Sequence, residues 1–196
     1  MALSWDEKYP ASYEFKPSPV FEKWKQEHKI CLIGKAGAGK STLGKELSKR
    51  GYVQLSFAAK LKSLAQDMIM KMPDKTVSKD RELLQKLGTE IGRWYQPDLW
   101  IRHFELVYWK WCKFGKKDFV VDDARFKNEI NFLIENGFMI VRVTGRSYDL
   151  GELGKHSSET ELDNIKVDGV IQNDGSIQES MWQLDYLMKT WESAHR

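Results

Sequence analysis

Short apolar runs alternate with longer segments of helical periodicity from residue 30 to the end of the chain. The apolar runs predict five strands, at Ile30–Ile33, Tyr52–Leu55, Phe119–Val121, Phe138–Val143 and Val170–Gln172. Helical periodicity predicts helices that begin near Ser41, Phe57, Arg81, Asp98 and Phe126, and a last helix at Ser176–Ala194. Because strands that alternate with helices build βαβ units, we predict an α/β fold of three layers, a five-stranded parallel sheet flanked by helices.

Three segments interrupt this alternation. Residues 1–28 precede the first strand and predict an N-terminal arm that packs on the domain or on a partner, with a disordered tail as the alternative. Residues 57–115 form a long, mostly helical insertion between the second and third strands. Residues 144–166 are polar, contain three glycines and lack periodicity, which is typical of a functional lid or of disorder. Residues 29–196 are therefore predicted to form one domain.

Composition limits the partners that this domain can have. The 31 basic and 28 acidic residues are interspersed and leave a net charge of +3, which does not argue for a nucleic-acid partner. No apolar stretch approaches the roughly 18 residues of a membrane span, and the first residues do not form a signal peptide. Cys31 and Cys112 are the only cysteines, too few for a disulfide framework or a zinc site. We expect a cytoplasmic protein that binds neither membranes nor nucleic acid.

The strongest motif is the segment GKAGAGKS at residues 34–41, which matches the P-loop pattern G-x-x-x-x-G-K-[ST] at every fixed position. It lies between a predicted strand and a predicted helix, as the motif requires. Its glycines let backbone N–H groups turn toward phosphate oxygens, and the helix start adds partial positive charge. Lys40 is expected at the β- and γ-phosphates and Ser41 at Mg²⁺. The predicted ATP-binding residues here are Gly37, Ala38, Gly39, Lys40, Ser41 and Thr42.

Two acidic residues follow the third predicted strand. Asp122 or Asp123 has the position of a Walker B carboxylate, which holds Mg²⁺, although an acid at a strand end also caps the next helix. Strand alternation places the two side chains on opposite sides of the sheet, so we expect one of them, assigned to Asp122, at the metal. Arg125 follows at the same edge and can hold a phosphate bidentately; an ion pair with Glu129 is the alternative.

Further arginines lie in the polar segment and in the insertion. Arg146 is predicted to neutralise the transferred phosphoryl group when the lid closes, whereas Arg142 lies within a strand pattern and can be structural. The nearby cluster His156–Glu159 has no triad or metal partner, so helix capping is its default role. Arg93, Trp94 and Trp100 flank a proline and predict a pocket with a base on an aromatic ring and a phosphate on an arginine. The helical stripe Trp100, Phe104, Val107, Tyr108 and Trp111 is interpreted as core.

Several shorter motifs accompany the P-loop in a defined order. They are Ser56–Lys62 (SFAAKLK), Leu84-Gln85 through Gly88–Glu90 and Arg93, Asp98–Trp100, Asp123–Glu129 (DARFKNE), His156–Glu159 (HSSE) and Ile171–Ser176 (IQNDGS). By their order and spacing, the chain from about residue 30 to its end resembles the deoxynucleoside monophosphate kinases of tailed bacteriophages, a branch of the P-loop nucleotide kinases. Among these motifs, only the P-loop is specific by itself; the others are informative through their order and spacing.

The resemblance implies a P-loop kinase fold in which the insertion binds the acceptor nucleotide and residues 144–166 close as a lid. It implies transfer of the γ-phosphate of ATP to the 5′-phosphate of a deoxynucleotide, giving dNDP and ADP in the host cytoplasm. In this reading Lys40, Arg125 and Arg146, with Mg²⁺, offset the repulsion between the two phosphates. Asn173 and Gly175 would lie beside the adenine of ATP. The implied acceptor-binding residues are Lys35, Phe57, Lys62, Arg93, Trp94, Trp100, Asp123 and Arg125.

Other functions stay open on the sequence alone. A kinase of dephospho-coenzyme A would share the P-loop and the Asn-Asp-Gly turn but would need neither Arg93 nor an aromatic pocket. A regulatory ATPase would need no acceptor site, and a scaffold would use residues 1–28 for docking. The loop residues 35–38 are mostly small, whereas members of the resembling family can be more basic there. The accepted bases, the choice between ribose and deoxyribose, and the state as monomer or homodimer are not predicted.

Overall fold

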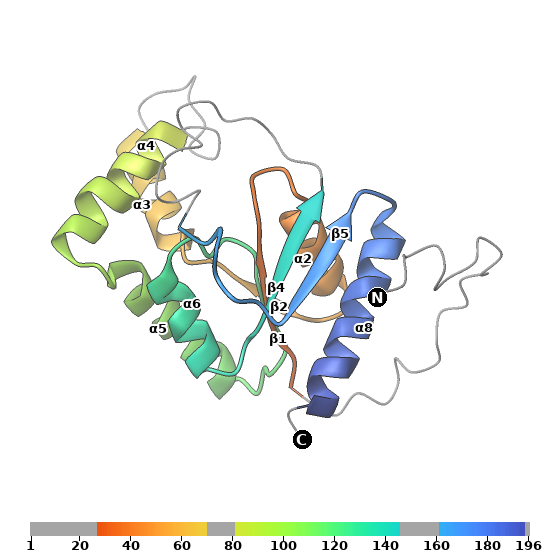
Figure 1. The fold of residues 1–196 in the computed structure, drawn as a ribbon. Coiled ribbons are helices and arrows are strands. Elements are labelled where there is room, and N and C mark those ends of the chain that lie inside the picture. Colours follow the sequence, from red (N-terminus) through yellow and green to blue (C-terminus); the bar gives the residue numbers. More distant parts are fainter. Residues whose placement is uncertain (1–26, 70–80, 146–160, 195–196) are drawn as a thin grey trace.

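The computed structural model describes residues 27–69, 81–145 and 161–194 (Figure 1). The predictions on the arm up to residue 26, on Arg146 and on His156–Glu159 lie outside these ranges, as does most of the predicted lid.

A parallel sheet forms the centre of the described structure. Its strands are β1 (Lys29–Ile33), β2 (Val53–Leu55), β3 (Phe119–Val121), β4 (Met139–Gly145) and β5 (Gly169–Asn173). They pair in the order β2-β3-β1-β4-β5, and every pair is parallel. The five predicted strands and the parallel sheet are confirmed. Since β1 lies in the middle, the P-loop that follows it emerges between the ends of β3 and β4.

Each face of the sheet has its own core because successive strand residues point to opposite sides. Cys31 and Ile33 face the side covered by α5 (Leu99–Lys113) and α6 (Lys127–Glu135). Ile30 and Leu32 face the side covered by α2 (Lys40–Lys49) and α8 (Ile177–Ala194). Figure 1 shows these two helical layers on either side of the sheet. The three-layer α/β arrangement is confirmed.

The last helix illustrates how the periodicity predicted the packing. Its buried or partly buried side chains recur at helical spacing, at Ile177, Met181, Leu184, Leu187 and Trp191. They cover the α2 side of the sheet, as the 3.6-residue period requires. Cys31 on the opposite face is fully buried, and this burial raises the pKa of its thiol. The interpretation of Cys31 as a small apolar core residue is confirmed.

The insertion between β2 and β3 is helical but less regular than predicted. It contains α3 (Ala59–Ile69), α4 (Arg81–Gln85), a π-helix η3 (Lys86–Arg93) and α5. Ala65 of α3 is buried against Leu83, Leu84 and Leu87, which form a small separate core. Figure 1 places α3 and α4 side by side beyond one edge of the sheet. The π-helix was not predicted, because periodicity over eight residues does not distinguish it from an α-helix.

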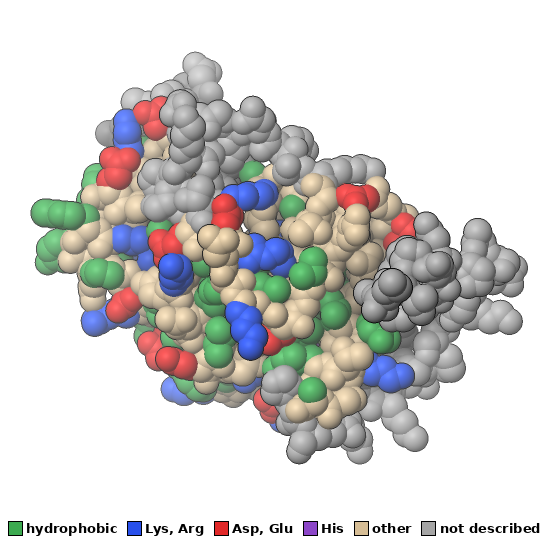
Figure 2. All heavy atoms as spheres, in the orientation of Figure 1, with side chains coloured by type: hydrophobic (Ala, Val, Ile, Leu, Met, Phe, Trp, Pro, Cys, Tyr) green, Lys and Arg blue, Asp and Glu red, His purple; other side chains and the backbone are tan. Residues whose placement is uncertain are grey.

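The aromatic stripe of α5 is only partly core. Trp100, Phe104 and Tyr108 are buried as predicted, but Val107 is 45% exposed and Trp111 is 37% exposed. The prediction is wrong for these two residues, which lie on either side of the buried Tyr108 with their own side chains partly open to solvent. Ile91, Trp94 and Tyr95 at the end of η3 are more exposed still. Figure 2 shows hydrophobic side chains protruding at the edge of the molecule that the insertion occupies.

Candidate active site

The P-loop begins directly after β1 and ends at the first turn of α2. Gly39 is the N-cap of α2 and has a φ of 97°, a conformation that favours glycine. A β-carbon there would collide with the side-chain amide of Asn173. Ser41 and Thr42 in the first turn are exposed. Because the first N–H groups of a helix have no partner within it, this end of α2 presents amide donors and two hydroxyl groups to solvent.

Lys40 lies across this loop. Its Nζ atom donates hydrogen bonds to the carbonyl oxygens of Gly34, at 2.6 Å, and Lys35, at 2.8 Å. The ammonium group is thus held at the mouth of the loop, next to the amide donors of α2. This is the place that the motif predicts for a cation that binds phosphate.

Asn173, at the end of β5, supports the loop from the side. Its Nδ2 donates a hydrogen bond of 2.9 Å to the carbonyl of Ala38, and its Oδ1 accepts one of 2.7 Å from the hydroxyl of Ser180. Ser180 is fully buried on α8. The side chain of Asn173 therefore links β5, α8 and the P-loop, a contact that the predicted role beside adenine did not include.

Asp122 and Asp123 follow β3 and point to different sides, as strand alternation predicted. Asp122 is 8% exposed and lies on the α2 side, where a β-carbon at Gly44 would be 3.6 Å from its Oδ2. Asp123 faces the insertion. It accepts hydrogen bonds from the hydroxyl of Ser56 at 2.5 Å and from the backbone N–H groups of Phe57 at 3.0 Å and Ala58 at 3.1 Å. Of the two, Asp122 is thus the carboxylate on the P-loop side.

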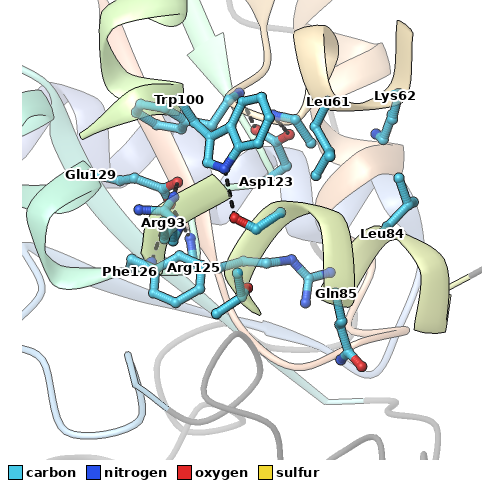
Figure 3. Close-up of a pocket in the computed structure, with 14 residues that line it drawn as sticks. Leu61, Lys62, Leu84, Gln85, Arg93, Trp100, Asp123, Arg125, Phe126 and Glu129 are labelled. Atoms are coloured by element: carbon cyan, nitrogen blue, oxygen red, sulfur yellow. Dashed lines mark hydrogen bonds and ion pairs between the residues drawn. The ribbon is translucent and has the colours of Figure 1, made fainter. Parts of the chain in front are cut away.

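A cavity of about 220 Å³ lies beside this strand end, between β3, α6 and the insertion (Figure 3). It brings together six residues that the sequence assigned to an acceptor site, Phe57, Lys62, Arg93, Trp100, Asp123 and Arg125. Its other lining residues are Ala58, Leu61, Leu84, Gln85, Gly88, Thr89, Phe126 and Glu129. Motif order singled out several of these positions, but no sequence signal marked Phe126 and Glu129 as cavity residues.

The wall of the cavity formed by the insertion is aromatic and closely packed. Trp100 is 5% exposed, and its indole Nε1 donates a hydrogen bond of 2.8 Å to the carbonyl of Gly88 in the π-helix. Phe57 stacks on Phe104, with ring centroids 4.1 Å apart. A β-carbon at Gly88 would lie 2.7 Å from a methyl carbon of Leu61, so a larger residue there would displace the Leu61 side chain between α3 and η3. The result is a fixed apolar surface of the kind that receives a planar ring.

Arg93 lies in the same cavity but is already held on several sides. Its Nη2 forms an ion pair with Glu129, and its Nη1 donates to the carbonyl of Pro97 at 3.1 Å and to Oδ1 of Asn128 at 3.4 Å. The guanidinium also stacks on Phe126, 3.8 Å from the ring centroid. The ion pair of Glu129 is therefore with Arg93, and the alternative pairing of Glu129 with the side chain of Arg125 is wrong.

Glu129 is a buried carboxylate with partners at both oxygens. While one oxygen pairs with Arg93, Oε2 accepts hydrogen bonds from the backbone N–H groups of Arg125, at 2.7 Å, and Phe126, at 3.1 Å. Burial raises the pKa of Glu129 from 4.5 to about 7, against the opposing effect of Arg93. In Figure 3 Arg125 extends across the cavity, away from the pair of Arg93 and Glu129.

Two predicted acceptor residues lie elsewhere. Trp94 is 83% exposed and does not line the cavity, because it follows Arg93 directly on the helix and points to another side. Lys35 is in the P-loop and forms an ion pair of 2.5 Å with Asp163, in the described C-terminal part of the predicted lid. Arg142 is structural, as its strand position suggested. It donates to the carbonyls of Leu162 at 2.9 Å and Ile165 at 3.0 Å in that segment.

A P-loop at the end of a central parallel strand, beside a lined cavity at the same sheet edge, defines a P-loop kinase. Comparison with protein families agrees, because a model of the family described as deoxynucleotide monophosphate kinase matches residues 52–183. This match covers more than half of the chain. The protein belongs to the deoxynucleotide monophosphate kinase family, and it is a phosphotransferase.

One solved structure supports the fold, and two others are similar at lower TM-scores. TT1252 from Thermus thermophilus is 17% identical, with a TM-score of 0.50, and the match covers 85% of this chain and 98% of that one. A shikimate kinase from Aquifex aeolicus is 15% identical, with a TM-score of 0.45 and coverage of 85% and 98%. A dephospho-CoA kinase from Campylobacter jejuni is 12% identical, with a TM-score of 0.45 and coverage of 86% and 98%.

No curated protein matches this sequence. None of the described helices is long and apolar enough to cross a membrane.

Proposed function

We propose that this protein transfers the γ-phosphate of ATP to the 5′-phosphate of a deoxynucleoside monophosphate, forming dNDP and ADP. The observation that carries the proposal is the divergence of two successive side chains after β3. Asp122 lies against α2 of the P-loop, whereas Asp123 binds the start of α3 at the cavity. One strand end therefore borders both sites, so a donor phosphate on the P-loop and an acceptor phosphate in the cavity would meet there.

In this proposal the P-loop binds the triphosphate. The amide donors at the start of α2 and the ammonium of Lys40 receive its phosphate oxygens, and Lys40 exchanges the carbonyls of Gly34 and Lys35 for them. Ser41 and Asp122 would hold Mg²⁺, since both offer the oxygen ligands that this ion prefers. When bound, Mg²⁺ would supply positive charge that offsets the negative charge developing during transfer.

The cavity binds the acceptor. Trp100 and Phe57 provide the apolar wall for the base, and Arg93, Arg125 and Lys62 supply positive charge for its phosphate. The attacking group is already an ionised phosphate, so the protein needs no strong general base. Its work is to align the two phosphates and to reduce their repulsion. The role of Arg146 in neutralising the transferred phosphoryl group stays a prediction. The bacteriophage source that the resemblance implied also stays a prediction.

The test is ADP formation by the purified protein with ATP and Mg²⁺ in the presence of single acceptors. The panel contains dAMP, dCMP, dGMP, dTMP, the corresponding ribonucleotides and dephospho-coenzyme A. Turnover that requires a deoxynucleotide, with dNDP as the product, supports the proposal. Turnover only with dephospho-coenzyme A would assign the runner-up activity, and ADP formation that ignores every acceptor would assign a regulatory ATPase.

A further inference from the structure

Glu129 joins two parts of the cavity wall that are distant in sequence. Through one oxygen its carboxylate pairs with Arg93 at the end of the π-helix. Through the other it accepts the backbone N–H groups of Arg125 and Phe126, which connect β3 to α6. Both segments line the cavity. A single side chain on α6 therefore determines how the insertion and the strand end meet at this cavity.

Ordinary helix capping does not account for this arrangement. Glu129 binds the N-cap N–H of Phe126 as the glutamate of a capping box does, but it also binds the N–H of Arg125 and pairs with Arg93. The side chain of Glu129 is 3% exposed and that of Arg93 is 10% exposed. Burying two charges costs free energy that their attraction does not reliably recover, so a buried pair is weak evidence for a gain in stability. Its position at the cavity wall indicates a role in binding instead.

The orientation of Arg93 is set completely by these contacts. Glu129 holds one side of the guanidinium, Pro97 and Asn128 hold another, and the ring of Phe126 covers a face. Arg125 is held at its backbone N–H, so its side chain begins at a defined point after β3. A phosphate between these two groups would meet a guanidinium of Arg93 whose direction is set before it arrives, which reduces the entropy cost of binding.

We propose that Glu129 is a positioning residue for the acceptor phosphate, and that it acts by setting the direction of the Arg93 guanidinium and the backbone position of Arg125 at the cavity wall. The inference rests on the proposed function, because it takes the acceptor to be a nucleoside monophosphate. Glu129 itself touches no reacting atom in this scheme.

The two-sided role requires the ionised carboxylate, so it is tested above pH 7, where the raised pKa of Glu129 leaves this group deprotonated. Both of its oxygens accept, one from a guanidinium and one from two backbone N–H groups. In Glu129→Gln the side chain keeps its size, but one of its ends becomes an NH₂ donor. Either orientation of the amide then places a donor against a donor, at Arg93 or at the backbone. The substitution therefore disturbs one of the two connections without emptying space.

The experiment compares E129Q with wild type for the deoxynucleotide that the acceptor panel identifies. We expect the acceptor KM, and the Kd of that deoxynucleotide measured by calorimetry without ATP, to rise about tenfold. The KM for ATP should stay within twofold. A merely structural role would lower kcat by reducing the folded fraction and would leave both KM values unchanged. The matched control is Glu161→Gln, which removes a carboxylate that accepts from Lys127 N–H at the same helix end but does not contact Arg93.

The pathway of the effect is tested by a double variant. If Glu129 acts through Arg93, E129Q raises the acceptor KM less in an Arg93→Ala background than in wild type. Equal effects in both backgrounds, or an acceptor KM of folded E129Q within twofold of wild type, would overturn the inference. Should E129Q not fold, Glu129→Asp, which keeps both acceptors on a shorter side chain, is judged by the same criteria. Wild-type protein that binds no deoxynucleotide would instead refute the proposed function itself.

Discussion

The side-chain amide of Asn173 donates a hydrogen bond of 2.9 Å to the carbonyl of Ala38 in the P-loop. These residues are 135 positions apart in the sequence. The contact couples the shape of the phosphate-binding loop to the end of β5 and, through the hydroxyl of Ser180, to α8. The loop is thus held by a neighbour that contributes no phosphate ligand in the proposed mechanism.

Replacement of Asn173 by Asp should weaken ATP binding. The substitution places a carboxylate oxygen against the Ala38 carbonyl, so a donor contact becomes a repulsive one. We expect the KM for ATP to rise about tenfold and the acceptor KM to change little, as measured by initial rates with each substrate varied. Ser180→Ala is the milder control, since it removes only the support of Asn173. An unchanged KM for ATP in the Asp variant would show that the contact does not shape the loop.

Loss of the Lys40 ammonium should abolish transfer while the protein stays folded. Lys40→Ala removes the cation proposed to stabilise the transferred phosphoryl group, which corresponds to a loss of about 10²–10³-fold in kcat. In the free protein its ammonium donates to two loop carbonyls, so the thermal unfolding temperature should change little. Retained turnover above about a tenth of wild type would contradict the assignment of Lys40.

Substitution of the two aspartates after β3 should affect different properties, the turnover rate for Asp122 and the stability of the fold for Asp123. Asp122→Asn removes the proposed Mg²⁺ ligand, so we expect kcat to fall about 100-fold. Its unfolding temperature should equal or exceed that of wild type, because a largely buried charge is lost.

Asp123→Ala should instead destabilise the protein, by about 1–2 kcal/mol, since Phe57 and Ala58 N–H lose their acceptor. Calorimetric unfolding of both variants, with Ser56→Ala as a weaker control at the same carboxylate, separates these effects. Equal losses of stability for the two aspartates would rule out the division of roles.

The dependence of stability on pH should carry a contribution from Glu129. Its pKa is raised from 4.5 to about 7 by burial, so between these values the folded protein holds a proton that the unfolded chain releases. The contribution is fully present below pH 4.5 and is lost as the pH rises through 7. The free energy of unfolding, measured by denaturant titration from pH 4.5 to 7.5, should therefore fall less steeply with pH in E129Q than in wild type. Identical slopes would argue against the raised pKa.

Local patterns were sufficient to predict the sheet and the nucleotide loop. Each strand is a short apolar run, and the P-loop is a contiguous motif whose chemistry follows from its own eight residues. The opposite directions of Asp122 and Asp123 were predicted too, since side chains alternate along any strand. In each of these cases the relevant neighbours are close in the sequence, so periodicity and spacing contain the information.

The partners of the cavity residues depend on contacts between distant segments. Arg93 was predicted to bind the acceptor phosphate, but its ion pair with Glu129, which is 36 residues away, was not predicted. Trp94 was assigned to the pocket and is exposed, because a rotation about the helix separates it from its neighbour. No pattern along the chain states which of several arginines a buried carboxylate will meet. Packing of the insertion against α6 made that selection, since burial requires each charge to find a partner within reach.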